Sequence, residues 1–337
     1  MLRRHPYLFL TLAITALSLL CLGTGAAHIP PAEVTRILMG GHGATDVQRF
    51  IVLESRLPQT ITALLSGASL AACGLMLQTA FRNPLAGPSI FGISSGASLG
   101  VALVMLLGGG TLTAGAATLT GTAAVVCGAA LGSLAVTATL VAMAQWVNSA
   151  TMLLIAGMMM GYVSSSLVTL LNFAATDEGV KNYVVWGMGD FSSVTLDMLP
   201  LYSLLCLTLM ASALLYVKPL NSLLLGRQYA ESIGINTLRA RNGLLVITSL
   251  LAATVTAFCG PVAFIGLAVP HLARLLLRSD NQRRLLPTSM LTGAATALLC
   301  NWICSLPLPG GSVPLNAVTP LIGAPVILFV IIHHRQY

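Results

Sequence analysis

The chain has 337 residues, of which 56% are hydrophobic and only 7% are charged, and its mean hydropathy is +0.89. Soluble globular domains carry about 25% charged residues, so the composition excludes an ordinary soluble domain and indicates a polytopic membrane protein. The net charge of +7 comes from 16 basic and 9 acidic residues. Because most of the basic residues fall at one expected membrane face, we interpret this charge as a topology signal and expect no nucleic-acid partner.

Ten apolar segments, separated by charged or proline-rich breaks, are expected to cross the membrane. A bilayer-spanning helix needs about 20 apolar residues, and the eighth segment is the shortest. The first segment also resembles a secretory signal, but its apolar run is long enough to span, and we expect it to be retained. The sequence therefore predicts an all-α membrane fold with helices at 7–27, 57–80, 88–108, 112–141, 150–173, 198–218, 242–260, 266–279, 287–306 and 315–333.

The charged residues predict the orientation, because Lys and Arg are retained in short cytoplasmic loops. With the N-terminus inside, 12 of the 16 basic residues lie at the cytoplasmic face, and the exceptions are Arg36, Arg49, Arg56 and Lys181. Only two acidic residues, Glu231 and Asp280, share that face. We therefore expect a multi-pass protein of a bacterial cytoplasmic (inner) membrane with both termini in the cytoplasm.

Several kinds of chemistry lack their usual residues in this sequence. The seven cysteines lie in or beside apolar spans without metal-ligand spacing, so we interpret them as packing residues and expect no metal site. The spans contain almost no Asp, Glu or Lys, which disfavours coupling to an ion gradient. Neither Lys181 nor Lys218 follows a glycine, so no phosphate-binding loop is present. We expect no catalytic residue and no bound cofactor, and energy for uphill transport would come from a partner.

The longest cytoplasmic segment, residues 218–242, is the candidate surface for that partner. Gly226 and Gly234 bracket a stretch that we expect to form a short helix, residues 227–233, with Ala230 small enough for close approach. A solvated connector with basic residues placed for topology is an equally good interpretation of this segment alone.

Four separated motifs resemble the FecCD family of permeases, which are the membrane subunits of type II ABC importers for iron siderophores, haem and cobalamin. The motifs are RLPQT with SGASLAACGLMLQ and NPLAGPSIFGISSGA, LLIAG at 153–157, LLLGRQYAESIG, and GPVAFIGLAVPHLARLL with LIGAPVIL. The resemblance covers residues 50 to 330. It implies a ten-helix subunit that pairs with a second permease copy in the lipid membrane, two ABC ATPase subunits that hold ATP and Mg, and a periplasmic or lipid-anchored substrate-binding protein.

An internal similarity favours an inverted repeat within a single domain spanning residues 1–337. LAACGLMLQTAFRNPLAGP and TAFCGPVAFIGLAVPHLAR each place a glycine, an apolar stretch and a proline in the same order, from opposite sides of the membrane. The first repeat would cover about 57–173 and the second about 242–333, with helix 6 at 198–218 and a coupling loop at 219–241 between them.

The resemblance assigns three sets of site residues. The ATPase-coupling set is Gly226, Arg227, Ala230, Glu231 and Gly234, the binding-protein docking set is Arg56 and Gln59, and the inner-gate set is Asn148, Ser149, Ala150 and Thr151. Some residues depart from the family pattern. Gln59 replaces a second arginine, Arg227 and Gly87 replace acidic residues, and the last outer loop lacks its usual acid.

The remaining motif residues have structural and pathway interpretations. Gln78 ends the first motif, and Asn83 and Pro84 break the chain after the second span, as a turn or as part of the pathway. Gly92, Gly96 and Gly100 recur every fourth residue, which favours close helix packing. Pro270 and His271 match the family's Pro-His pair, and a structural hydrogen bond is the favoured role of the histidine.

The sequence thus predicts an importer permease that works by alternating access and is not itself an enzyme. A ferric siderophore is the leading substrate, with haem and cobalamin as alternatives. An ion-driven carrier is the second functional class. A hydrolase built on the G-I-S-S-G match around Ser94 is the third, and that motif needs a strand-to-helix turn.

Overall fold

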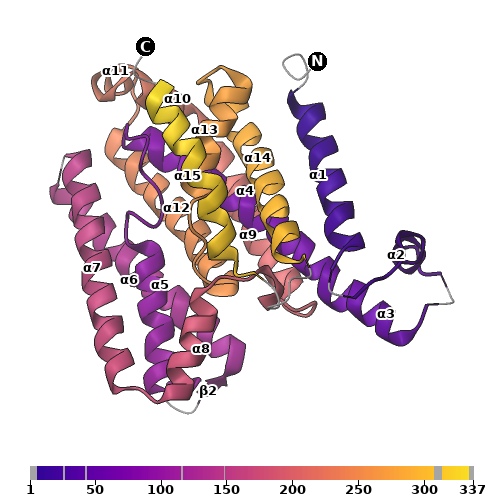
Figure 1. Cartoon of the computed structure of the whole chain (residues 1–337). Coiled ribbons are helices and arrows are strands. Elements are labelled where there is room, and N and C mark those ends of the chain that lie inside the picture. Colours follow the sequence, from indigo (N-terminus) through magenta and orange to yellow (C-terminus); the bar gives the residue numbers. More distant parts are fainter. Residues whose placement is uncertain are drawn as a thin grey trace.

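The computed structural model describes residues 6–25, 27–41, 44–114, 117–147, 149–306 and 313–333. Long helices run between two ends of the molecule, with α1 at one edge and α7 at the other (Figure 1). The helices, in chain order, are α1 (Pro6–Gly23), α2 (Pro31–Leu38), α3 (Asp46–Phe50), α4 (Leu57–Ala80), α5 (Ile93–Ala102), α6 (Gly121–Trp146), α7 (Ala150–Ala174), α8 (Asp177–Gly187), α9 (Leu199–Leu215), α10 (Val217–Leu225), α11 (Arg227–Ser232), α12 (Thr237–Cys259), α13 (Ile265–Leu277), α14 (Gln282–Cys304) and α15 (Leu315–His333).

Shorter elements complete the fold. Two π-helical turns, η1 (Ile51–Arg56) and η2 (Leu103–Leu107), extend α4 and α5, and η3 (Phe191–Ser193) is a 3₁₀ turn. Strands β1 (Thr111–Ala114) and β2 (Ala117–Thr120) form an antiparallel hairpin with Thr111 opposite Thr120. Polar caps start several helices. For example, the Asn236 and Asn281 side chains accept hydrogen bonds from backbone amides at the starts of α12 and α14.

A helix stands at each of the ten expected positions within the described residues, but several boundaries were wrong. Helices α12 and α14 begin at Thr237 and Gln282, ahead of the predicted starts at 242 and 287. The segment predicted at 112–141 begins with the hairpin, and its helix starts at Gly121 because the Gly- and Thr-rich residues before it pair as strands. The helix predicted at 88–108 starts at Ile93, after Gly92 takes a left-handed conformation with φ +72°. Helix α9 does not run straight to residue 218: the chain bends by 48° between α9 and α10.

By length and hydropathy, five helices in the described part of the chain can cross a membrane, or six if the bent pair α9–α10 is one span. Three further apolar helices, Ile93–Leu107, Ile265–Leu277 and Leu315–Val330, are shorter. Short helices inside a bundle fit a membrane protein whose broken segments are buried by their neighbours.

Helix α4 is the centre of the bundle, and glycines allow its close contacts. A Cβ atom on Gly67 would collide with the backbone of Gly293 in α14, and one on Gly74 would collide with the backbone of Gly266 in α13. Lipid gives no hydrophobic drive between helices, so such small residues are what lets backbones approach and gain dispersion contacts. The window of α4 that crosses the membrane is 89% buried, whereas that of α1 is 17% buried.

The packing repeats itself between the two halves of the chain, as expected for an inverted repeat. Helix α5 contacts α6 and α7, and α13 contacts α14 and α15 in the same way, while α12 lies against α6 as α4 lies against α14. The residue before each short helix has a positive φ, +72° at Gly92 and +64° at Phe264. Gly92 packs on Gly157 of α7, and Phe264 packs on Gly323 of α15.

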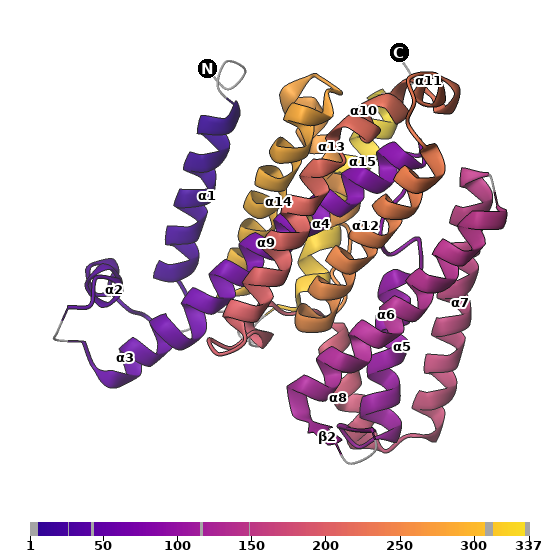
Figure 2. The ribbon, with the colours of Figure 1, turned by 180° about the vertical axis from the view of Figure 1, so that it is seen from behind.

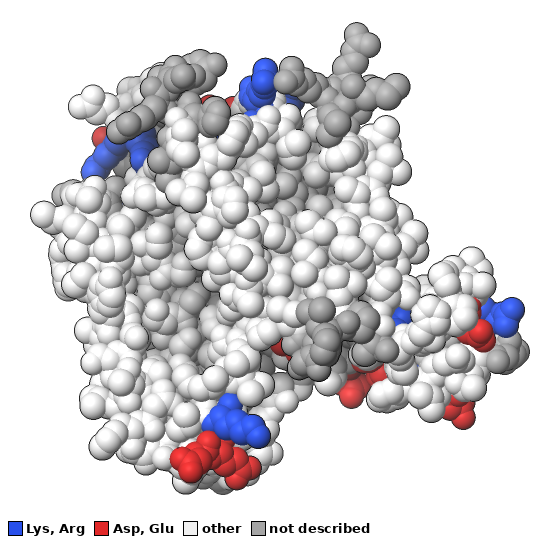
Figure 3. Space-filling view, viewed as in Figure 1, with Lys and Arg blue, Asp and Glu red and all other residues white. Residues whose placement is uncertain are grey.

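The first and last described residues lie at the same end of the molecule as α10 and α11, in the views from both sides (Figures 1 and 2). Basic side chains gather at that end, and acidic ones are prominent at the opposite end (Figure 3). This charge separation follows the pattern on which the cytoplasmic orientation of both termini was predicted.

Candidate functional site

The short helix α11 lies at the end of the molecule that carries most of the basic residues (Figures 1 and 3). The predicted helix between two glycines is confirmed: α11 spans Arg227–Ser232, Gly226 precedes it with φ +120°, and Gly234 follows with φ +84°. Both values suit glycine, so the glycines set the ends of α11. Tyr229 and Ile233 are 48% and 51% exposed, and this apolar surface is available to a partner.

Ala230 does not take part in that surface. Its side chain is fully buried, in a cluster that includes Leu220, Leu223 and Leu244. The expectation that Ala230 lets a partner approach was therefore wrong, because its small side chain instead lets α11 lie tightly on its own bundle.

Three side chains fix the conformation of α11. Arg227 Nε donates to Glu231 Oε1 at 2.7 Å, and Thr237 Oγ1, at the start of α12, donates to the same oxygen at 2.7 Å. The hydrogen bond from Arg227, followed by that from Thr237, lowers the pKa of the Glu231 carboxyl. The acid and base are both about half exposed, so the pair defines geometry more than it adds stability.

Arg82 fastens the neighbouring helix end, a role that the sequence analysis missed by treating it only as a topology signal. Its Nε donates to the Leu223 carbonyl at 3.1 Å and its Nη2 to that of Leu224 at 2.6 Å, which satisfies the last carbonyls of α10. A cavity of about 150 Å³ lies beside it, lined in part by Arg227 and Arg241. The position of Arg82, next to the Asn-Pro break, is the signal that could have drawn attention to it.

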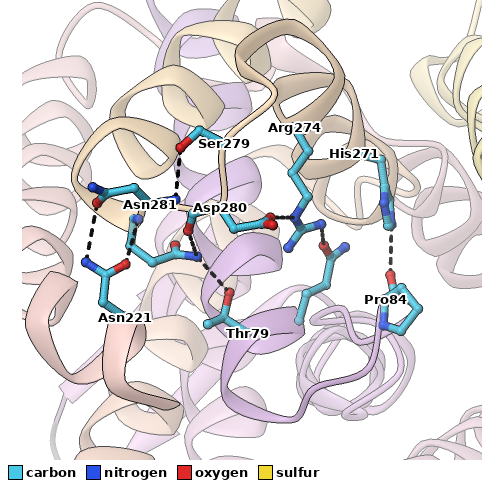
Figure 4. Close-up of polar contacts among 10 residues, drawn as sticks. Thr79, Pro84, Asn221, His271, Arg274, Ser279, Asp280 and Asn281 are labelled. Carbon is cyan, nitrogen blue, oxygen red and sulfur yellow. Dashed lines mark hydrogen bonds and ion pairs between the residues drawn. The ribbon is translucent and has the colours of Figure 1, made fainter. Parts of the chain in front are cut away.

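A polar network joins the end of α4 to α13 (Figure 4). Arg274 Nη1 donates to Gln78 Oε1 at 2.8 Å, and the Arg274 guanidinium lies 3.8 Å from the Asp280 carboxylate. His271 Nε2 donates to the Pro84 carbonyl at 2.9 Å. The structural role favoured for His271 thus agrees with its buried position, 4% exposed.

The same network continues to α10 and α14. Gln282 Nε2 lies 3.4 Å from Thr79 Oγ1. Asn221 Oδ1 accepts a hydrogen bond from the backbone amide of Gln282 at 2.9 Å (Figure 4). Asn83 Oδ1 accepts from the Leu85 amide at 2.9 Å, which stabilises the turn at the break. A cavity of about 620 Å³ opens beside these groups and is lined by Gln78, Arg82, Asn83, Pro84, His271, Arg274, Leu275, Arg278, Ser279, Asp280, Phe329 and Val330.

The predicted inner gate falls at the junction of α6 and α7. Asn148 lies outside the described residues, and Ala150 and Thr151 begin α7. Ser149 caps that helix by accepting a hydrogen bond from the Met152 amide at 3.3 Å. From α12, Arg241 donates to the carbonyls of Ala144 and Val147, at 2.5 and 3.2 Å. The structure therefore links the gate segment to the helix that follows α11, and the gating role stays a prediction.

The predicted docking residues of the outer end are turned inward. Arg56 is 6% exposed and donates to the carbonyls of Leu22 and Ala27, at 2.9 and 2.5 Å. Gln59 Nε2 donates to Asn301 Oδ1 at 2.9 Å. Both side chains line a cavity of about 530 Å³. In this conformation they tie α1 and α14 to α4, and their docking role stays a prediction.

Gly96 and Gly100 pack α5 against α6. A Cβ atom on either would collide with the backbone of Gly132 or Gly128. Ser94 lies in the first turn of α5, which follows a series of turns and not a strand, so the context of a hydrolase elbow is missing. Pro270 lies inside α13 and is buried.

A bundle of apolar helices with broken segments, and with an exposed short helix braced at one end, defines the class of polytopic membrane permeases. Comparison with known proteins specifies the family. The model of the FecCD transport family matches residues 11–333, so the chain belongs to this family. It is a permease subunit of an ABC importer.

Two relatives and one solved structure illustrate the similarity. The chain is 34% identical over 338 residues to the vitamin B12 import system permease protein BtuC of Klebsiella pneumoniae, covering 99% of this chain and 95% of the relative. It is 30% identical over 335 residues to the hemin transport system permease protein HmuU of Yersinia pestis, covering 99% and 98%. The structure of a putative metal-chelate type ABC transporter in an inward-facing conformation superposes with a TM-score of 0.83 at 28% identity, covering 98% of both chains.

Proposed function

We propose that this chain moves a metal chelate into the bacterial cytoplasm by alternating access, driven by a pair of separate ATPase subunits that dock on α11. The observation that supports this proposal best is that helix α11 is exposed and is held in place at both ends. Its ends are set by Gly226 and Gly234, and Arg82 fixes the preceding helix, so movement of a docked partner would be passed to the spans. ATP and Mg would be held by the partner, and none by this chain.

The charges around α11 suggest the charge of the ATPase surface that would dock there. Arg227 stands where related permeases carry an acid, and Arg82 and Arg241 line the same cavity. Glu231 already pairs with Arg227 and Thr237. We propose that the partner brings an acidic or neutral surface to this position, because like charges facing one another across an interface oppose association.

A second permease copy and an external binding protein complete the proposed assembly. Helix α7 exposes hydroxyl groups of Ser165 and Ser166 along with Tyr162, which is 68% exposed. Hydroxyls in a span favour a protein or water contact over lipid. We place the second copy and the pathway on this side of the molecule, with both termini in the cytoplasm.

The substrate that we propose first is a ferric siderophore. Haem and cobalamin are the specific alternatives, because relatives named for hemin and vitamin B12 match nearly the whole chain. All three are large chelates that would need a wide path lined by small and apolar residues.

The test is ATP hydrolysis and uptake in liposomes that contain this chain, a candidate ATPase and a candidate binding protein, with a ferric siderophore, haem and cobalamin as substrates. Gly234→Arg should abolish uptake, because it strains a residue at φ +84° and places a bulky cation on the docking surface. Gly40→Arg is the matched control. Gly40 has φ +74° and, like Gly234, open space around it, but it follows α2 and does not belong to the segment around α11.

Uptake that needs all three components and is lost only in Gly234→Arg would support the importer and its coupling helix, and the substrate panel would name the cargo. Uptake by the permease alone would contradict the proposal if it does not depend on ATP and stops when the ion gradient is dissipated. That result would favour a secondary carrier.

A further inference from the structure

The residues between α1 and α4 form an arm that projects sideways from the bundle, beside the end of α1 (Figures 1 and 2). We call the described residues 27–41 and 44–56 the outer arm. It contains α2, α3 and η1. Ile29, Val34, Ile37 and Val52 are buried together with Leu22 of α1. The outer arm is therefore an ordered structure with an apolar cluster of its own.

Other apolar side chains of the outer arm are not used in that cluster. Met39 is 88% exposed, Val47 is 67% exposed and Phe50 is 65% exposed. Val47 and Phe50 are three residues apart in one helix, so they lie on neighbouring positions of its surface. A water-facing arm whose apolar cluster is already complete gains nothing from exposing Val47 and Phe50 side by side and Met39 besides, so these side chains indicate a contact surface.

The distribution of charge indicates which way this surface faces. In Figure 3 the upper part of the projection that faces the viewer is uncharged, whereas acidic and basic atoms lie along its outer and lower edges and a basic atom lies near its junction with the bundle. On α2, Arg36 pairs with Glu33 at 3.9 Å, and Arg36 lies across the helix from the buried Val34. The arm therefore presents exposed apolar side chains bordered by charged ones, which is the pattern of an interfacial helix.

The arm adjoins a surface that faces lipid. Helix α1 is a membrane span with little burial, and Leu8, Leu12 and Leu19 are 60%, 62% and 58% exposed. The chain from Asp46 to Ala80 is one helical run of 35 residues, about 52 Å long at 1.5 Å per residue, against a hydrocarbon core of about 30 Å. In Figures 1 and 2 this run lies oblique to α1, and its first turns, which form α3 and include Val47 and Phe50, lie beyond the end of α1.

We propose that the outer arm is an interfacial anchor that lies on the outer leaflet, with Met39, Val47 and Phe50 in the lipid and Arg36 at the level of the phosphates. Long apolar and aromatic side chains partition into this boundary, while arginine reaches to the headgroups. The proposal rests on the membrane span and on the proposed orientation with both termini in the cytoplasm, and it is independent of the transported substrate.

The test uses nitroxide labels on the full chain in lipid nanodiscs of phosphatidylethanolamine and phosphatidylglycerol. Met39→Cys, Val47→Cys and Phe50→Cys are labelled one at a time. Leu12→Cys on α1 is the lipid reference, and Glu178→Cys on α8 is the water reference. The unsubstituted chain, labelled in parallel, gives the background from the seven native cysteines. Relaxation by oxygen, which concentrates in lipid, is compared with relaxation by a water-soluble nickel chelate.

The expected result is an oxygen-to-nickel ratio at residues 47 and 50 that is several-fold above the Glu178 value and approaches that of Leu12. A ratio equal to that of Glu178 would overturn the proposal. A label that is open to nickel in nanodiscs but is shielded when a binding protein is added would also overturn it, and would make the arm a protein-docking surface. Because all labelled positions are exposed, gel filtration should show normally folded protein in every case.

Discussion

Arg82 shows how one side chain can hold an unfavourable backbone conformation. Its φ is +47°, in the left-handed region that costs a non-glycine residue about 1–2 kcal/mol. In this conformation its guanidinium reaches the Leu223 and Leu224 carbonyls together. The two hydrogen bonds come from a charged, forked donor that lysine cannot reproduce. The left-handed backbone at position 82 would suit glycine, but the two hydrogen bonds require the side chain of arginine.

We expect Arg82→Lys to reduce uptake per ATP hydrolysed at least several-fold while leaving the protein folded. Lysine keeps the charge but cannot bond both carbonyls, so the end of α10 would loosen. Uptake and ATPase rates in liposomes give the ratio. Arg239→Lys, exposed at the same end of the molecule, is the control, and equal ratios in both variants would contradict the role of Arg82.

Glu231 should titrate at lower pH than an ordinary glutamate. Its hydrogen bonds to Arg227 and Thr237 favour the carboxylate, so its pKa is lowered in the folded protein. The stabilising effect on α11 is therefore fully present above the unfolded value of about 4.3 and is lost as the pH falls through the lower folded value.

Carbon NMR of labelled glutamate carboxyls measures this pKa directly, because the chain has only four glutamates, and Glu231→Gln assigns the signal. Arg227→Ala should raise the midpoint more than Thr237→Val, since the bond from Arg227 is the larger cause. No change in either variant would show that the bonds around Glu231 do not form in solution.

At the residue scale, the sequence could predict the glycines at the ends of α11 but not the directions of long side chains. Gly226 and Gly234 mark helix ends that can be recognised in the sequence, because backbone conformation depends on local residue type. Arg56 was predicted to be an outward docking residue, yet it donates hydrogen bonds to the main-chain carbonyls of Leu22 and Ala27. Such acceptors are contributed by the fold and have no signature in the sequence.

At the scale of elements, the contact between α5 and α6 depends on the absence of side chains. We expect Gly100→Leu to destabilise the protein by at least the roughly 1–3 kcal/mol typical of an overpacked core, because a Cβ there already collides with the Gly128 backbone. Thermal unfolding in detergent provides the measurement. Gly187→Ala is the control, since a Cβ at Gly187 meets nothing within 4 Å, and a loss no larger than the control's would contradict the packing.

Element positions were predictable because apolar runs of membrane length are separated by charges and prolines. Start points were less predictable wherever tertiary structure interrupts an apolar run. The hairpin of β1 and β2 contains no charged residue or proline and leads directly into α6, so no break in the sequence separated the two. The bend between α9 and α10 occurs within a stretch that is helical on both sides.

At the scale of the whole molecule, the two edges of the bundle differ in kind. Helix α1 presents mainly leucines and other apolar residues outward, whereas α7 exposes Ser165 and Ser166 beside Tyr162. We expect a bifunctional thiol reagent to cross-link Tyr162→Cys into a dimer in proteoliposomes, because α7 is the proposed contact with a second copy. Leu12→Cys on α1 should stay monomeric, and equal cross-linking of both would contradict this arrangement.

The bend at Tyr216 has a mechanical consequence for the proposed transport cycle. Helix α10 is about 13 Å long and is joined at one end to α9 through the 48° bend and at the other to α11. Gly243 of α12 lies directly against the Tyr216 hydroxyl, and a Cβ atom at this position would displace the tyrosine side chain. Helix α10 can therefore act as a short lever whose pivot rests on α12. A displacement of α11 by about 2 Å across the lever would rotate it by about 9°, so a small sideways push would reach α9 as a torque.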